Sequence, residues 1–176
     1  MPFHAFVDES IRRDRYLLCA VLIPVAELAA ARALARSFCL PGHRRWHFWH
    51  ESAQRQRKIL GSLRRIRGMQ IWVIEGRGRE VPTRHECLTA LVIDLLDLGA
   101  GRLVIESRES QDARDRRTVA SALGKRSGEL PYVHLPPHSE PALWWPDAVA
   151  WSFGAGGSWK SAVAPFIDIN KDVGAC

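Results

Sequence analysis

Residues 3–24 read FHAFVDESIRRDRYLLCAVLIP and contain two apolar runs separated by a charged segment. The runs at 3–9 and 16–24 are rich in β-branched and aromatic residues, which favours strands. Pro24 closes the second run. The stretch therefore predicts that the fold begins with a β-hairpin.

The first predicted strand ends on two adjacent acids, Asp8 and Glu9. Successive strand residues point to opposite faces, so at most one of these carboxylates shares the face of Phe6. Carboxylates are rarely buried without a partner. The pair is therefore either a solvated strand end or a site in which one acid binds a ligand and the other supports it.

The rest of the chain alternates between helical and strand patterns. The sequence predicts helices over 25–38, 50–67, 82–99, 110–126 and 141–157, further strands over 69–76, 102–109 and 130–137, and a mixed tail. A starting hairpin followed by alternating elements is typical of an α/β fold with a mixed sheet. We expect a single domain over residues 1–176, with about five strands flanked by helices.

Composition and charge limit the function classes. The chain has 176 residues, a net charge of +6 at pH 7, and only four lysines among its 25 basic residues (58, 125, 160 and 171). Arginine suits phosphate recognition, although a GC-rich coding sequence would give the same bias. The apolar run near residue 20 is too short to span a membrane. Four cysteines without a C-x-x-C pair argue against a zinc or disulfide framework and favour a cytoplasmic protein.

Two further acids stand in apolar surroundings. Glu106 ends the strand RLVIE (102–106), and ligands of open α/β sheets gather beyond such strand ends. Asp147 is the only charged residue in ALWWPDAVAWSF (142–153), and a lone carboxylate there needs a cation or strong donors. Alternatively, Asp147 follows Pro146 at a helix start and complements the helix dipole. Carboxylates from several elements suit Mg²⁺ or Mn²⁺ and two-ion phosphodiester hydrolysis.

The remaining motifs indicate no specific metal site or catalytic site. His47 and Glu51 are four residues apart and would share a helix face. Their run does not match the HExxH zinc pattern, and RHEC (84–87) does not match the deaminase pattern. We find neither a G-x-S-x-G elbow nor a Walker loop.

Four short motifs together resemble a known group of proteins: FVDES (6–10), HFWHES (47–52), IESRES (105–110) and WWPDAVAW (144–151). In this order they resemble the ribonuclease H-like superfamily and, more narrowly, the bacterial and phage family of domains of unknown function numbered 3800. The resemblance implies a metal-dependent nuclease with Asp8, Glu106 and Asp147 as metal ligands. It also implies Glu51 or Glu9 as a fourth acid, and we expect His47 to support the site.

The sequence thus predicts a Mg²⁺- or Mn²⁺-dependent nuclease acting on RNA or DNA, with Asp8, Glu51, Glu106 and Asp147 as catalytic residues. Arg108, Arg114 and Lys160 are candidates for phosphate contacts. The alternative is a catalytically silent module that binds nucleic acid or protein. The tryptophans at 144, 145, 151 and 159 favour core packing, with a stacking surface or homodimer face as the other possibility.

Overall fold

A six-stranded mixed sheet forms the centre of the molecule, which we describe from a computed structural model over residues 2–175. Its strands are β1 (Phe3–Arg12), β2 (Arg15–Pro24), β3 (Gln70–Arg77), β4 (Arg102–Glu106), β5 (Tyr132–Leu135) and β6 (Ile169–Ala175). The spatial order is β5-β4-β1-β2-β3-β6. Strands β1, β2 and β3 are joined by antiparallel pairing, whereas β4, β5 and β6 add in parallel.

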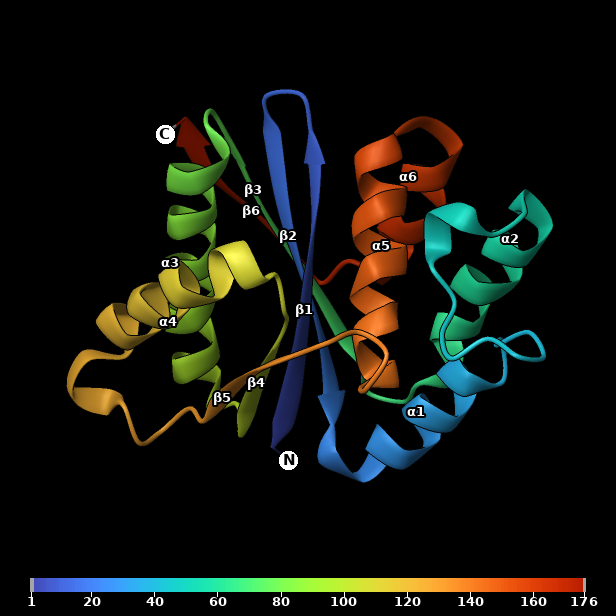
Figure 1. Ribbon diagram of the computed structural model, residues 1–176, viewed down its shortest axis with the longest axis horizontal. Coiled ribbons are helices and arrows are strands. Elements are labelled where there is room, and N and C mark those ends of the chain that lie inside the picture. Colours follow the sequence, from blue (N-terminus) through green and yellow to red (C-terminus); the bar gives the residue numbers. More distant parts are fainter. Residues whose placement is uncertain (1, 176) are drawn as a thin grey trace.

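Helices cover both faces of the sheet and give three layers (Figure 1). One face carries α1 (Leu28–Arg36), α2 (Ala53–Ser62), α5 (Trp144–Ala155) and α6 (Gly157–Val163). The other carries α3 (Glu80–Leu98) and α4 (Glu109–Leu123). No helix within residues 2–175 is both long and apolar enough to cross a membrane.

Alternate side chains of β1 pack into two separate hydrophobic cores, one on each face of the sheet. Phe6 packs into the core under α5, whereas Ala5 and Val7 pack into the core under α3. The same alternation continues along β2, where Leu17 and Leu18 go to opposite cores. Because side chains alternate across a strand, these central strands are apolar on both faces until their polar ends begin.

The predicted fold class and the starting hairpin are confirmed, with one strand more than the five expected. Strand β6 has the sequence INKDVGA and lies at the sheet edge with most of its residues exposed. It has no apolar alternation, so the sequence predicts only a mixed tail here. The last predicted helix corresponds to α5, and α6 is a further helix in the segment predicted as a mixed tail. Gly156, which adopts a positive φ, separates the two helices.

Candidate functional site

The ends of two neighbouring strands bring Asp8 and Glu106 to the same face of the sheet. Strands β1 and β4 are parallel, with Val7 opposite Ile105, so the next residue on each strand is an acid. Val104 belongs to the core under α5, and Glu106 shares its side of the pleat. Asp8 points to this same side because it alternates with Val7. The expected alternation of Asp8 and Glu9 is therefore present.

Helix α5 contributes the third acid from above this face. Asp147 lies in its first turn, and Gly154 lets the helix approach β1 closely. A Cβ atom at Gly154 would lie only 3.1 Å from Ser10 Oγ and from Leu17 Cδ1. The close approach holds the helix that bears Asp147 against the strand that bears Asp8.

The segment before α2 fixes the orientation of Asp147. Its Oδ2 atom accepts a hydrogen bond of 3.1 Å from the backbone N–H of Phe48, and His47 Nδ1 lies 3.4 Å from the same oxygen. Burial lowers the pKa of His47, although the charge of Asp147 opposes this effect. His47, which we expected to support the site, thus contacts one of the three acids.

Burial disfavours the charged form of all three carboxylates, and neighbouring carboxylates add to this effect at Asp8 and Glu106. Burial, and then the negative charges of Glu106 and Asp147, raise the pKa of Asp8 well above its ordinary value. Burial also raises the pKa of Asp147, and it raises the pKa of Glu106 to about 7. The positive charge of Arg45 opposes all three shifts. We refer to Asp8, Glu106 and Asp147 as the acid triad.

Arg45 is the member of this environment that the sequence did not indicate. It lies in the loop before the Phe48–His50 turn and acts on the triad through its charge. Its surroundings, PGHRRWH, contain two adjacent arginines and no periodicity, so nothing distinguished it from a solvent-exposed residue.

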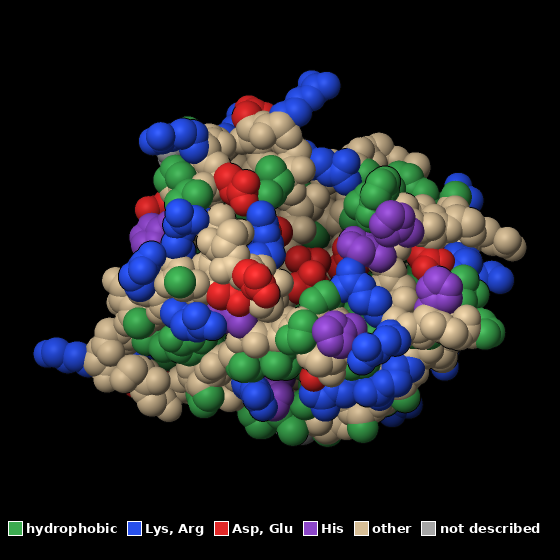
Figure 2. Space-filling view, viewed as in Figure 1, with side chains coloured by type: hydrophobic (Ala, Val, Ile, Leu, Met, Phe, Trp, Pro, Cys, Tyr) green, Lys and Arg blue, Asp and Glu red, His purple; other side chains and the backbone are tan. Residues whose placement is uncertain are grey.

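A cleft of about 340 Å³ opens beside the triad. Its walls include Ser10, Arg12, His47, Trp49, Asp147 and Trp151. Figure 2 shows acidic side chains near the middle of the view beside a hollow, with histidine and basic side chains around them. Of the three acids, Asp147 lines this cleft.

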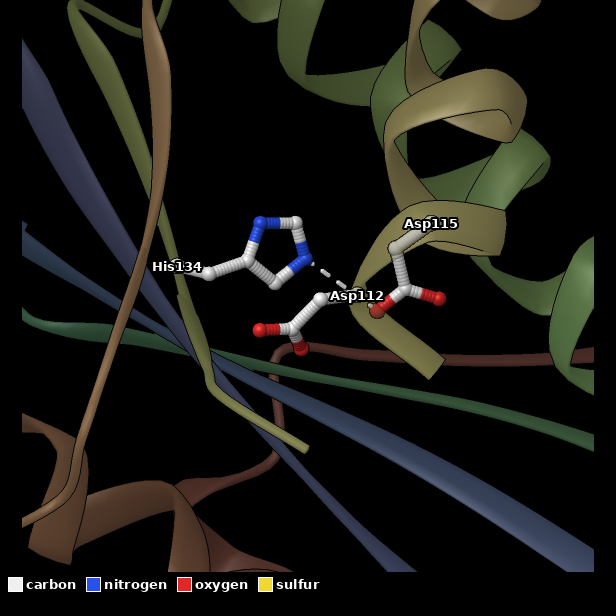
Figure 3. A group of neighbouring side chains, drawn as sticks. All are labelled: Asp112, Asp115 and His134. Atoms are coloured by element: carbon white, nitrogen blue, oxygen red, sulfur yellow. Dashed lines mark hydrogen bonds and ion pairs between the residues drawn. The ribbon is translucent and has the colours of Figure 1, made fainter. Parts of the chain in front are cut away.

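A second polar cluster lies on the opposite face of the sheet. One ligand atom each from Asp112, Asp115 and His134 lie within 4.8 Å of one another, which makes them a carboxylate–histidine cluster (Figure 3). Arg84 donates two hydrogen bonds of 2.8 and 2.7 Å to Asp115. Asp112 accepts hydrogen bonds from the Ser107 hydroxyl and from the backbone N–H of Arg108. Protein donors thus already bind the oxygens of this cluster.

Glu9 extends this second cluster from the sheet. Its carboxylate forms ion pairs with Arg84 and Arg108 and accepts a 2.6 Å hydrogen bond from Tyr16. Burial alone would raise the pKa of Asp115, but the hydrogen bonds from Arg84 and His134 lower it to about 2. We refer to Glu9, Arg84, Asp115 and His134 as the ionic network.

The structure gives the remaining predicted site residues other partners. Glu51 forms an ion pair with Arg55, one helical turn away. Arg108 binds Glu9 and Glu80 on the far face. Arg114 lies beside a larger pocket of about 860 Å³ between α3 and α4, also on the far face. The ammonium group of Lys160 lies 4.2 Å from the ring centroid of Phe153. The contacts described for these four residues are therefore with groups other than the acid triad.

The tryptophans of the last helix mostly serve the core, which is the alternative that the sequence favours. Trp144 and Trp145 are buried and stack edge-on against Trp46. Trp151 and Trp159 are partly buried and pack against the same core. They do not form a continuous exposed surface.

Comparison with solved structures identifies the architecture. A chain of the PCNA:RNase HII complex from Archaeoglobus fulgidus is similar with a TM-score of 0.55 and 12% sequence identity, over 93% of this chain and 75% of that chain. The fold is ribonuclease H-like. No family model and no curated protein matches the sequence, so the narrower resemblance to the domains of unknown function numbered 3800 is not confirmed.

Proposed function

We propose that the protein is a metal-dependent nuclease whose active site is the acid triad. The observation that carries the proposal is the convergence of Asp8, Glu106 and Asp147 from three separate elements, each with a raised pKa. Folding alone does not favour three neighbouring carboxylates whose burial opposes their ionisation. Such perturbed groups in an open cleft are typical of functional sites.

The donor set of the triad fits Mg²⁺ or Mn²⁺. Carboxylate oxygens are hard ligands, and these ions prefer them. A divalent cation would also favour the charged form of the three carboxylates, which burial disfavours. The ionic network fits a metal less well, because Arg84 already supplies the positive charge to Asp115 and Glu9.

The residues of the chain have distinct roles in this proposal. Bound divalent ions would supply an activated water and stabilise the leaving oxygen of a phosphodiester. Asp8, whose pKa is raised by both other acids, would hold the metal together with Glu106 and Asp147. The Phe48 N–H and His47 hold Asp147 in position. Arg45 brings positive charge to a site that a polyanion must approach.

Nucleic acid is the substrate class that suits this site. The chain carries a net charge of +6, and Arg12 and Arg45 lie on the side of the triad. Arg108 and Arg114, on the far face, are poorer candidates for phosphate contacts at the reacting group.

The test is cleavage of labelled single- and double-stranded RNA and DNA with Mn²⁺, with Mg²⁺ or with EDTA. We expect metal-dependent cleavage that falls at least a hundredfold in Asp8→Asn and Asp147→Asn, because each removes a ligand charge. Asp97→Asn is the matched control, because this exposed acid of α3 pairs with Arg126 and its loss should leave cleavage unchanged. Protein that binds nucleic acid but never cuts it would instead favour the silent binding module.

A further inference from the structure

An indole is exposed next to the acid triad. Trp49 lies in the Phe48–His50 turn that binds Asp147, and its exposure of 57% is the highest of any large hydrophobic side chain in residues 2–175. Ile11, also exposed, lines the same cleft. Two exposed apolar side chains at one cleft are unusual for a surface that only meets water.

The cleft combines aromatic faces with a cation. The ring centroids of Trp49 and His50 are 4.4 Å apart, and those of His47 and His50 are 5.3 Å apart. On the other wall, the Arg12 guanidinium lies 5.6 Å from the ring centroid of Trp151. Asp147 stands at the edge of the same cleft. A flat, uncharged ring attached to an anionic backbone matches this arrangement.

We propose that this cleft binds one unstacked base of a single-stranded nucleic acid, next to the phosphodiester at the acid triad. The inference rests on the proposed nuclease function and names its substrate class. In a duplex each base is stacked and paired, so an indole can face a base only where the strand is single. Aromatic stacking accepts every base, so the cleft selects strandedness and not sequence.

The geometry also indicates that Arg12 binds the backbone of the nucleic acid. Its guanidinium lies over Trp151 on the cleft wall, where it can meet a phosphate while the base occupies the space beside Trp49. A volume of about 340 Å³ is at the small end for ligand pockets, which suits one base better than a larger group.

The test measures binding without cleavage. In an Asp8→Asn background, fluorescence anisotropy compares a short labelled single strand, the corresponding duplex and a fully abasic strand. We expect Trp49→Ala to weaken single-strand binding about tenfold, the size expected for one lost base–aromatic stack. Trp49→Phe should retain most of the affinity. The duplex and the abasic strand should bind equally well whether or not the protein carries the Trp49→Ala substitution.

Ile93→Ala is the matched control, because Ile93 is an exposed apolar residue of α3 on the far face and should change nothing. An equal loss for single strand and duplex in Trp49→Ala, or no loss for either, would overturn the proposal. So would a homodimer that Trp49→Ala dissociates while single-strand binding stays unchanged, because Trp49 would then face a second copy of the chain.

Hydrolysis of bis(p-nitrophenyl) phosphate by the unmodified protein with Mn²⁺ separates the two proposals, because this diester has no base. If it is hydrolysed but Trp49 does not affect strand binding, the base cleft is wrong and the nuclease stands. If it is not hydrolysed but single-strand binding depends on Trp49, the nuclease is wrong and the cleft remains a binding site.

Discussion

Two groups of ionisable side chains lie on opposite faces of β1, and they differ in how their charge is balanced. The ionic network surrounds buried Arg84 with Glu9 and Asp115, and its electrostatics lower the pKa of Asp115 to about 2. The acid triad has raised pKa values, which nearby positive charges, among them Arg45 and His47, compensate only in part. The first group favours the folded state, whereas the second opposes it at neutral pH.

This contrast indicates which of two superficially similar clusters to regard as functional. Within residues 2–175, the group with three potential ligand atoms within 4.8 Å of one another is Asp112, Asp115 and His134, but its oxygens already accept hydrogen bonds. The acid triad lacks such donors, apart from the backbone N–H groups that bind Asp8 and Asp147. Unbalanced charge, and not proximity alone, is thus the basis on which we propose the acid triad as the metal site.

The largest effect should come from removing the cation of the ionic network. Arg84→Met leaves Glu9 and Asp115 buried without their main partner, which should cost about 3–5 kcal/mol in the free energy of unfolding. Urea unfolding measures this loss. Arg126→Met is the control, because its exposed pairs with Asp97 and Glu129 should change stability by less than about 1 kcal/mol. Similar losses in both variants would show that the network is not a buried ion cluster.

The same Glu→Gln substitution on either side of the sheet should change the free energy of unfolding in opposite directions. At pH 8 without metal, Glu106→Gln should raise the free energy of unfolding by about 3 kcal/mol, because the pKa of Glu106 is raised from 4.5 to about 7 and each pKa unit corresponds to about 1.4 kcal/mol. Glu9→Gln should lower it by a similar amount, because it breaks charged hydrogen bonds to arginine. Urea unfolding of both variants gives the two signs, and a loss in each would remove the distinction between the clusters.

The stability gained by Glu106→Gln should depend on pH, because the pKa of Glu106 is raised in the folded state. The pKa of Glu106 is about 7 when folded and 4.5 as an ordinary glutamate, so the folded state holds the extra proton between these values. Stability contributed by this group therefore falls as pH rises through that window. Urea unfolding at pH 4 and pH 8 checks this, and a gain that is equal at both values would contradict the raised pKa.

A smaller effect should distinguish the two clusters as metal sites. Mn²⁺ at ten times its dissociation constant should stabilise the protein by about 1.4 kcal/mol, which corresponds to a rise of about 3–5 °C in Tm. Thermal unfolding should show this rise in the unmodified protein and in Asp112→Asn, but not in Asp8→Asn. The reverse pattern would move the metal to the carboxylate–histidine cluster.

Particular residues explain what the sequence could predict. Two apolar runs rich in β-branched and aromatic residues within 3–24 indicated the hairpin, and isolated acids in apolar surroundings pointed to Glu106 and Asp147. The Glu51–Arg55 ion pair could also be predicted from the sequence, because its two residues have i, i+4 spacing.

Other features depend on contacts between distant residues and could not be predicted. Arg84 looks like an exposed helix residue in PTRHEC, yet it is buried because Glu9 and Asp115 reach it from other elements of the fold. Strand β6 forms through edge pairing with β3 and carries no apolar pattern of its own. The exposure of Trp49 depends on where its turn lies relative to α5, while neighbouring Trp46 is buried.

The adjacency of Asp8 and Glu9 on opposite sides of β1 has an evolutionary consequence. The residues that would perform chemistry and the residues that hold the fold together are separate, although they are neighbours in the chain. A single substitution at Asp8 would then abolish activity and relieve repulsion without disturbing the ionic network. Descendants of such a protein could lose catalysis at no cost in stability and persist as binding domains on the same scaffold.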